Sequence, residues 1–251
     1  MASSREDVVV LTPTRNQPTG LRLLDGYLRR QTFQDFTWVV VDDGEGSITP
    51  ERCDHMLVHS GEGKNGAQSF LDNLAFGLDF IEARDLGAHA LIFCEHDDWY
   101  GAEHVGALVD AIDTRDVVGS TVQRYYHVGL RRWRVYTNHG ASSLSQTAMD
   151  PSYRPLLRRA IRDCRTRGIL GVDAAFWGGV DRRHAGLSKE ADHVVSIKGL
   201  PGPRGLGLGH RPKKVLTWNE DPDLEVLASW IGEEDAGSYA GFREEADRRC
   251  S

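Results

Sequence analysis

Cysteine and long apolar runs are the two features that this 251-residue sequence most plainly lacks. The four cysteines, Cys53, Cys94, Cys164 and Cys250, stand far apart and form no Cys-x-x-Cys pair, so neither a zinc site nor a disulfide framework is indicated. No apolar run approaches the roughly 20 residues that cross a bilayer, and the N-terminal residues lack the apolar core of a signal peptide. We therefore expect a soluble protein of a reducing cytoplasm, or of the host cytoplasm if the source is viral, without membrane contact.

Positive charge is also scarce, because 30 lysines and arginines face 37 aspartates and glutamates, for a net charge of -7. This balance argues against binding nucleic acid with the whole surface, although a local basic groove stays open. The hydrophobic content of 40% is enough for a sizeable core. A chain of this length is expected to form one domain, here residues 1–251, and we see no linker inside it.

Strands and helices are expected to alternate in the first hundred residues. Apolar runs and helical spacing predict, in chain order, strand 8–11, helix 21–30, strand 36–41, helix 67–83 and strand 90–94. This alternation is typical of an α/β fold with a mainly parallel sheet flanked by helices, and it makes residues 1–100 a nucleotide-binding half.

The rest of the chain is expected to be mixed. Within residues 101–220 the pattern predicts helix 103–112, strands 117–122 and 132–136, helix 153–167 and strand 194–197. A C-terminal helix at 224–231 and a polar, frayed tail beyond Glu233 should follow.

The strand predicted at 90–94 ends in a cluster of three carboxylates, Glu95, Asp97 and Asp98. The carboxyl end of such a strand stands at the mouth of an open α/β sheet, where ligands bind. Three clustered carboxylates repel one another and need a compensating cation, and Mg²⁺ or Mn²⁺ suits oxygen ligands. The alternative is an acidic loop that caps the next helix.

Five motifs in order resemble family 2 glycosyltransferases of the GT-A fold, over roughly residues 8–180. They are Val8 to Asn16, Val39 to Gly44, Asn65-Gly66 with Asn73 before Gly77-Leu78, Ile92 to Trp99, and Gly171 to Asp173. The resemblance implies a Rossmann-like GT-A fold and inverting transfer of a sugar from a nucleoside-diphosphate sugar, a UDP-sugar above all, to an acceptor hydroxyl. It makes residues 101–220 the acceptor half. The sequence departs from the family where Glu95 and His96 replace the usual first aspartates.

The resemblance also implies the residues of the donor site. Asp97 leads the ligands of Mn²⁺ or Mg²⁺, with Glu95 and Asp98 beside it and His210 able to complete the set; such an ion would stabilise the leaving diphosphate. Asp42 or Asp43 contacts the base or ribose, unless Asp-Asp-Gly only builds a turn. The same pocket is lined by Pro13, Thr14, Arg15 and Asn73, and Lys64 meets a phosphate or stays solvated.

Asp173 is the candidate general base, because an inverting transferase must deprotonate the acceptor hydroxyl. The alternative role for Asp173 is to cap a helix. The Gly- and Pro-rich segment from Lys198 to Lys214 carries Arg204 and Arg211 and could close over the diphosphate. The alternative is a solvated basic loop.

The run from Lys198 to Arg211 is similar to that of small phage-type transferases, some of which attach sugars to hydroxymethylated pyrimidines in DNA. With the aromatic and basic residues of 124–134, this similarity implies such a pyrimidine in DNA as the acceptor.

Other functions stay open. A saccharide or a small-molecule hydroxyl is the main alternative acceptor. A nucleotidyltransferase would normally carry a Gly-rich phosphate loop after the first strand, which Thr12 to Asn16 is not. A non-catalytic nucleotide-sugar-binding module would not need the carboxylates at 95, 97, 98 and 173. The sequence does not indicate an oligomeric state.

Overall fold

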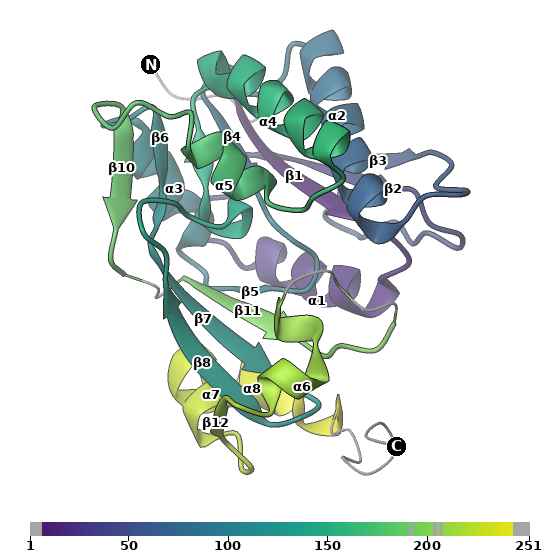
Figure 1. Ribbon diagram of the computed structural model, residues 1–251, viewed down its shortest axis with the longest axis vertical. Helices are drawn as coiled ribbons and strands as arrows, with labels where there is room; N and C mark the ends of the chain where they lie inside the picture. The colour runs from purple at the N-terminus through teal and green to yellow at the C-terminus, as the bar shows by residue number, and fades with distance from the viewer. Residues whose placement is uncertain (1–6, 191–192, 203–204, 206–207, 243–251) are drawn as a thin grey trace.

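The computed structural model describes residues 7–190, 193–202, 205 and 208–242, which form two sheets (Figure 1). The larger sheet has seven strands in the order β10-β6-β9-β4-β1-β2-β3. Their bounds are β1 (Val8–Thr14), β2 (Thr37–Asp42), β3 (His55–Val58), β4 (Ala90–Phe93), β6 (Val117–Ser120), β9 (Ala148–Met149) and β10 (Ala185–Ser188).

Most neighbours in this sheet run parallel. Strands β3, β2, β1 and β4 are parallel, as are β6 and β10, and only β9 pairs antiparallel with its neighbours β4 and β6 among the strands described here. The register sets Thr14 of β1 opposite Asp42 of β2 and Leu11 opposite Phe93 of β4, so the carboxyl ends of these strands meet at one edge. The predicted α/β fold with a mixed, mainly parallel sheet is confirmed.

Helices cover both faces of the larger sheet (Figure 1). On one face Val8 and Val10 of β1 pack with α1 (Pro18–Arg29) and α3 (His104–Ile112). On the other face Val9 and Leu11 pack with α2 (Gly66–Ala83), α4 (Arg154–Arg167) and α5 (Val172–Trp177). A strand that is buried on both faces needs apolar residues at every position, which is why β1, β2 and β4 could be predicted from short apolar runs.

The smaller sheet has five strands in the order β12-β8-β7-β11-β5. Their bounds are β5 (Trp99–Tyr100), β7 (Val122–His127), β8 (Arg132–Thr137), β11 (Val194–Lys198) and β12 (Asn219–Glu220). Strand β7 pairs antiparallel with β8 and parallel with β11. Tyr126, Val195 and Ile197 join the same core cluster as Val8 and Val10 of the larger sheet, so the two sheets share apolar contacts.

The strand predicted at 117–122 is wrong in its extent. Strand β6 ends at Ser120 in the larger sheet, and β7 begins at Val122 in the smaller one. The Ser120 hydroxyl donates to the Val122 carbonyl and accepts from the Val122 N–H, both at 3.1 Å, which stabilises the change of direction. Residues that continue a strand pattern in the sequence can therefore belong to two sheets.

The expectation of a frayed tail is also wrong as far as residue 242. After α7 (Glu225–Ile231) the chain forms α8 (Glu233–Ser238) and a 3₁₀ turn (Ala240–Phe242). Tyr239 is 1% exposed and its hydroxyl lies 2.5 Å from that of Tyr27. Asp235 accepts from Trp99 Nε1 at 2.6 Å and from Arg30 Nη1 at 2.8 Å. Asp235 and Tyr239 thus tie this part of the tail to distant side chains, whereas Glu233, Glu234 and Ser238 are exposed.

The remaining short elements are α6 (Pro212–Val215) and the 3₁₀ turns Leu144–Gln146, Pro151–Tyr153 and Leu208–His210. None of the helices in the described ranges combines the length and the apolar character required to span a bilayer.

Candidate active site

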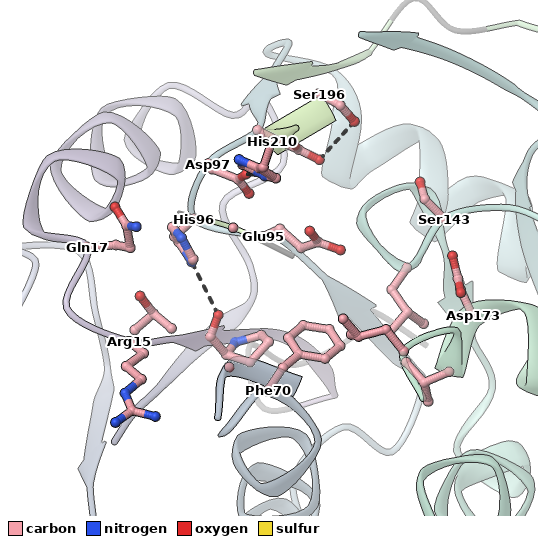
Figure 2. A pocket seen from close by; sticks show the side chains of 18 of the residues that line it. Arg15, Gln17, Phe70, Glu95, His96, Asp97, Ser143, Asp173, Ser196 and His210 are labelled. Atoms are coloured by element: carbon pink, nitrogen blue, oxygen red, sulfur yellow. Dashed lines mark hydrogen bonds and ion pairs between the residues drawn. The ribbon is translucent and has the colours of Figure 1, made fainter. Parts of the chain in front are cut away.

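A cavity of about 560 Å³ lies at the carboxyl ends of β1 and β4, where the two sheets meet. Figure 2 shows Arg15 and Gln17 on one side, Ser143 and Asp173 on the opposite side, and Glu95 between them. Strands β7 and β11 of the smaller sheet complete the lining with Gln123, Tyr125, Ser196 and Lys198. This is the edge at which open α/β sheets bind ligands.

All three clustered carboxylates line this cavity. Asp98 is 2% exposed, and its Oδ1 accepts from Lys198 Nζ at 3.0 Å while its Oδ2 accepts from Ser196 Oγ at 3.2 Å. Asp97 Oδ2 accepts from Lys198 Nζ at 2.8 Å and lies 3.3 Å from His210 Nε2. Within the described residues, the Glu95 carboxylate has neither an ion pair nor a hydrogen bond.

These contacts separate the pKa values of the carboxylates. Burial, together with the negative charges of Asp98 and Asp97, raises the pKa of Glu95 well above its usual range. Burial acts in the same direction on Asp97, but Lys198 and His210 outweigh it and hold the pKa of Asp97 well below its usual range. Glu95 therefore keeps its proton to higher pH than a solvated glutamate, while Asp97 stays ionised.

A chain of polar side chains supports the cluster from the smaller sheet. Tyr125 donates to Gln123 Oε1 at 2.7 Å, and Gln123 Nε2 donates to Ser196 Oγ at 2.9 Å. The register places Ser196 opposite Tyr125, so these residues lie on one face of β7 and β11. Gln123 and Ser196 were not predicted as site residues, whereas Tyr125 was named as part of the stretch 124–134 and Lys198 as part of its segment. The sequence signal that could have indicated them is period-two alternation. Ser196 lies between the buried Val195 and Ile197, and Tyr125 precedes the buried Tyr126.

The carboxylates do not form a complete set of metal ligands as they stand. No group of three or more His, Cys, Asp and Glu side chains with the arrangement of a metal site occurs within the described residues. Asp98 is engaged by Lys198 and Ser196 through both of its oxygens. The requirement for Mn²⁺ or Mg²⁺ and the roles of Glu95, Asp97, Asp98 and His210 as ligands stay predictions.

The predicted donor residues at the ends of β1 and α2 come together. Pro13, Thr14, Arg15 and Asn73 all line the cavity. The Arg15 guanidinium donates to the carbonyls of Lys64 at 3.0 Å and Gly61 at 3.1 Å. Asn73 Nδ2 donates to the Thr14 carbonyl at 2.7 Å, which fixes the β1 end against α2.

Lys64, Asp42 and Asp43 are not among the lining residues. Lys64 Nζ pairs with Asp72 at 2.9 Å, and Asp42 Oδ1 accepts from the Gly44 N–H at 2.7 Å. Asp43 Oδ1 accepts from Ser69 Oγ at 2.6 Å and from Asn73 Nδ2 at 3.1 Å. The turn-forming interpretation therefore describes Asp42, whereas Asp43 holds the start of α2.

Several buried polar atoms near the ends of β1 and β2 have no hydrogen-bond partner in the described part of the chain. They include Asp43 Oδ2, Thr14 Oγ1 and Asn16 Oδ1. A buried polar atom without a partner is costly unless a ligand supplies one. Contact of Asp43 with a nucleotide stays a prediction, and Oδ2 is the atom that could make it.

The Gly-rich segment contributes His210 and Gly205 to the lining. A Cβ on residue 205 would collide with the His210 ring, so any other residue there would require that ring to move. Arg211 is exposed and does not line the cavity, and Arg204 lies outside the described residues.

Asp173 lies in the first turn of α5 and lines the cavity. The N-cap of this helix is Gly171, with φ of 136°, and no side chain caps it. Asp173 Oδ1 accepts from the Ala174 N–H at 2.8 Å. Burial raises the pKa of the Asp173 carboxyl. Asp173 is therefore not the N-cap, and a raised pKa suits a group that takes up a proton near neutral pH.

The aromatic and basic stretch 124–134 does not form one surface, contrary to the basis of the DNA prediction. Tyr126 is buried, and Arg132 Nη2 pairs with Glu220 at 2.6 Å. Tyr125 lines the site, whereas Arg124 and Trp133 line a second cavity next to Val226 and Trp230 of α7. Alternation along β7 and β8 divides the stretch between two faces.

No family model and no curated protein is similar enough to this sequence to match it. Among solved structures, the chain is similar to S. aureus TarS 1-349 in complex with UDP-GlcNAc, with a TM-score of 0.50 and 15% identity over 81% of this chain and 60% of that one. The same TarS fragment with UDP gives a TM-score of 0.48 and 14% identity over 76% and 60% of the two chains. A longer TarS chain gives 0.49 and 13% over 76% and 37%.

The chain thus spans at most 60% of the length of these TarS chains. Identities of this order show the fold alone. That fold is GT-A-like, as the sequence resemblance implied.

Proposed function

We propose that this protein transfers a sugar from a nucleoside-diphosphate sugar, with a UDP-sugar as the first candidate, to an acceptor hydroxyl with inversion. The observation that carries the proposal is a single cavity with Arg15 on one side, Asp173 opposite, and Glu95 between them (Figure 2). A donor and an acceptor could lie in it end to end. The UDP-GlcNAc complex of TarS, which has a similar fold, supports the choice of donor.

The nucleotide is proposed to lie at the ends of β1 and β2. Asp43 Oδ2 and Thr14 Oγ1 are buried atoms with hydrogen-bonding capacity left. A carboxylate oxygen can accept from the N–H of a uracil ring, and a hydroxyl can meet either a donor or an acceptor. The Arg15 side chain, which lines the cavity, adds positive charge on the side where the phosphates would lie.

Asp173 is proposed to act as the general base. Its carboxylate would take the proton of the acceptor hydroxyl as that oxygen bonds to the anomeric carbon of the sugar. The bond between this carbon and the diphosphate oxygen breaks from the opposite face, and the diphosphate leaves with the electron pair. The pKa of Asp173, raised by burial, brings the base closer to neutral pH and makes it a stronger proton acceptor.

The acceptor side of the cavity has an apolar wall made by Phe70, Leu144, Leu170 and Val172. Leu170 and its neighbour Ile169 are 41% and 46% exposed, although both are large and apolar. Exposed apolar groups beside a polar site are typical of a contact surface. They would suit an acceptor with a flat apolar face, which supports a hydroxymethylated pyrimidine in DNA as the acceptor to test first. A saccharide or small-molecule hydroxyl is the second.

The test has two stages. Melting temperatures are measured with UDP-, GDP-, ADP- and dTDP-sugars, and a rise with one of them identifies the donor. That donor is then incubated with DNA containing hydroxymethylcytosine or hydroxymethyluracil, and with free saccharides, and the products are identified by mass spectrometry.

A sugar-mass increase on the modified nucleoside would support the DNA acceptor, and an increase on saccharides alone would replace it. Asp173→Asn should lose turnover in either case. Asp181→Asn serves as the matched control, because Asp181 pairs with Arg183 and does not line the cavity. Failure of all donors to bind or react would contradict the proposed function.

A further inference from the structure

Lys198 places a positive charge inside the carboxylate cluster. Its Nζ donates to Asp97 Oδ2 at 2.8 Å and to Asp98 Oδ1 at 3.0 Å. We propose that this ammonium group is the resident cation of the cluster, so that the site binds a nucleoside diphosphate without a divalent ion. The proposal rests on the proposed function for the identity of that ligand, and it competes with the metal requirement expected from the sequence.

The burial of Lys198 indicates that its ion pairs with Asp97 and Asp98 are part of the stable fold. The residue is 6% exposed. An ammonium group that is taken out of water is strongly disfavoured unless it is paired and hydrogen-bonded. The two aspartates supply that pairing, and they in turn would repel each other without a cation between them. The charged form of Lys198 is thus stabilised by Asp97 and Asp98, and the charged forms of the two aspartates are stabilised by Lys198.

The backbone around Lys198 fixes the position of its side chain. The Lys198 carbonyl accepts from the Val128 N–H at 2.8 Å, which anchors the end of β11 beside β7. The turn that contains Gly209 packs over the stem, where a Cβ on residue 209 would lie only 2.7 Å from Lys198 Cγ. The stem therefore has little room to swing the ammonium group away from the carboxylates.

A divalent ion would have to compete with this ammonium group for the same oxygens. Asp98 already has both oxygens engaged, by Lys198 and by Ser196. An ion on Asp97 Oδ2 would approach the Nζ that lies 2.8 Å from that oxygen, and like charges repel strongly in a buried site. The arrangement disfavours metal binding as long as Lys198 stays in place.

The third N–H of Lys198 is available for a ligand. An ammonium group has three donors, and two of them go to Asp97 and Asp98. The side chain lines the cavity, and within the described residues no acceptor takes the third. A phosphate oxygen is a strong acceptor for such a group. Lys198 would thus hold the carboxylates in place and bind the leaving diphosphate.

The experiment compares wild type with Lys198→Met, which removes the charge and keeps the length of the stem. A second variant, Lys198→Met with Asp98→Asn, avoids leaving a buried carboxylate unpaired. Lys189→Met is the matched control, because Lys189 is exposed, lies outside the Gly-rich segment and does not line the active-site cavity. Calorimetry measures UDP binding in EDTA and in MnCl₂, and Mn²⁺ binding with and without UDP.

We expect wild type and Lys189→Met to bind UDP equally well in EDTA and in MnCl₂. The two Lys198 variants should lose roughly tenfold or more in UDP affinity in EDTA, because a hydrogen bond to a charged group is lost. Lys198→Met should bind Mn²⁺ roughly tenfold more tightly than wild type, because the competing charge is gone.

A wild-type UDP affinity that falls tenfold or more in EDTA would overturn the proposal, and so would Mn²⁺ binding that Lys198→Met leaves unchanged. If neither variant folds, the wild-type comparison in EDTA and MnCl₂ decides alone. If UDP, GDP, ADP and dTDP all fail to bind, the proposed function fails, while the Mn²⁺ titrations of wild type and Lys198→Met still decide the role of Lys198.

Discussion

Strands β2 and β4 both end in carboxylates, but the two ends differ in where their partners come from. At the β2 end, Asp42 and Asp43 bond to the Gly44 N–H and to the side chains of Ser69 and Asn73, all within the first half of the chain. At the β4 end, Asp97 and Asp98 bond to Lys198, about a hundred residues away.

The difference indicates that carboxylates at a strand end form part of an active site only when another part of the fold packs opposite them. Local partners engage Asp42 Oδ1 and Asp43 Oδ1, and Asp43 Oδ2 is buried without a hydrogen bond in the described residues. At the β4 end, the smaller sheet brings Lys198 into contact with Asp97 and Asp98, and α5 brings Asp173 to the same cavity. Substitutions of residues that line the cavity should therefore mainly reduce activity. Substitutions at the β2 end should mainly reduce stability.

The largest effect is expected for Asp173→Asn. The amide cannot accept the acceptor proton, so kcat should fall about 10²- to 10⁴-fold while donor affinity stays near that of wild type. Steady-state kinetics and calorimetry with the donor measure the two quantities. A variant that lost only melting temperature would show that Asp173 has a structural role.

Asp97→Ala should come next, with a loss of about 10²- to 10³-fold in kcat/KM, of the size seen when one oriented electrostatic partner is removed from an active site. Lys198 and His210 would lose their shared acceptor, and the cavity would lose the carboxylate that stays ionised. Wild-type activity in this variant would show that Asp97, at the β4 end, has no role in the reaction. Asp116→Ala is the control, because Asp116 lies away from the cavity.

The pH dependence should reveal the base. Asp173 acts only when deprotonated, and burial raises its pKa above the usual value of 3.8. Activity should therefore be present above that raised pKa and fall about tenfold per pH unit below it. The rate of Asp173→Asn, measured over the same range, should lack this acid limb. A limb that persists in Asp173→Asn would belong to another group, such as Glu95.

Asp43→Asn tests the buried oxygen at the β2 end, Asp43 Oδ2, that has no hydrogen-bond partner in the described residues. The amide can still accept from Ser69, but an N–H₂ group replaces either Oδ2 or that acceptor. If Oδ2 accepts from the base of the nucleotide, UDP affinity should fall about tenfold, as expected for one lost bond to a charged group. Calorimetry with UDP checks this, and an unchanged affinity would leave Asp43 with a purely structural role.

The smallest effect is expected for Asp42→Ala. Its Oδ1 accepts from the Gly44 N–H, and the side chain does not line the cavity. Loss of one such bond costs about 1 kcal/mol of stability. Thermal unfolding should show a lower melting temperature, with UDP affinity changed less than in Asp43→Asn. A larger loss of affinity than in Asp43→Asn would reverse our choice between the two aspartates.

The larger sheet could be predicted from sequence because its signals are local. Strands β1, β2 and β4 are short apolar runs buried on both faces, and α2 begins at Asn65, where Asn65 and Gln68 cap it reciprocally. The smaller sheet was predicted only in part. The strands expected at 132–136 and 194–197 are β8 and β11, whereas β7 was not predicted, because it carries polar residues such as Gln123 on the face that lines the cavity. Polar residues in a strand resemble loop residues until their partners are known.

The sequence by itself determined most strands and helices of the first hundred residues and the carboxylates at the ends of β2 and β4, because apolar periodicity and strand ends involve neighbouring residues only. Only the tertiary structure decided which carboxylates face a cavity and which cation compensates them. The reason is distance along the chain, since Lys198 lies 101 positions from Asp97 and meets it only through the packing of β11 against β7 and β5. A buried charge is stable only beside its partner, and the fold brings that partner to it.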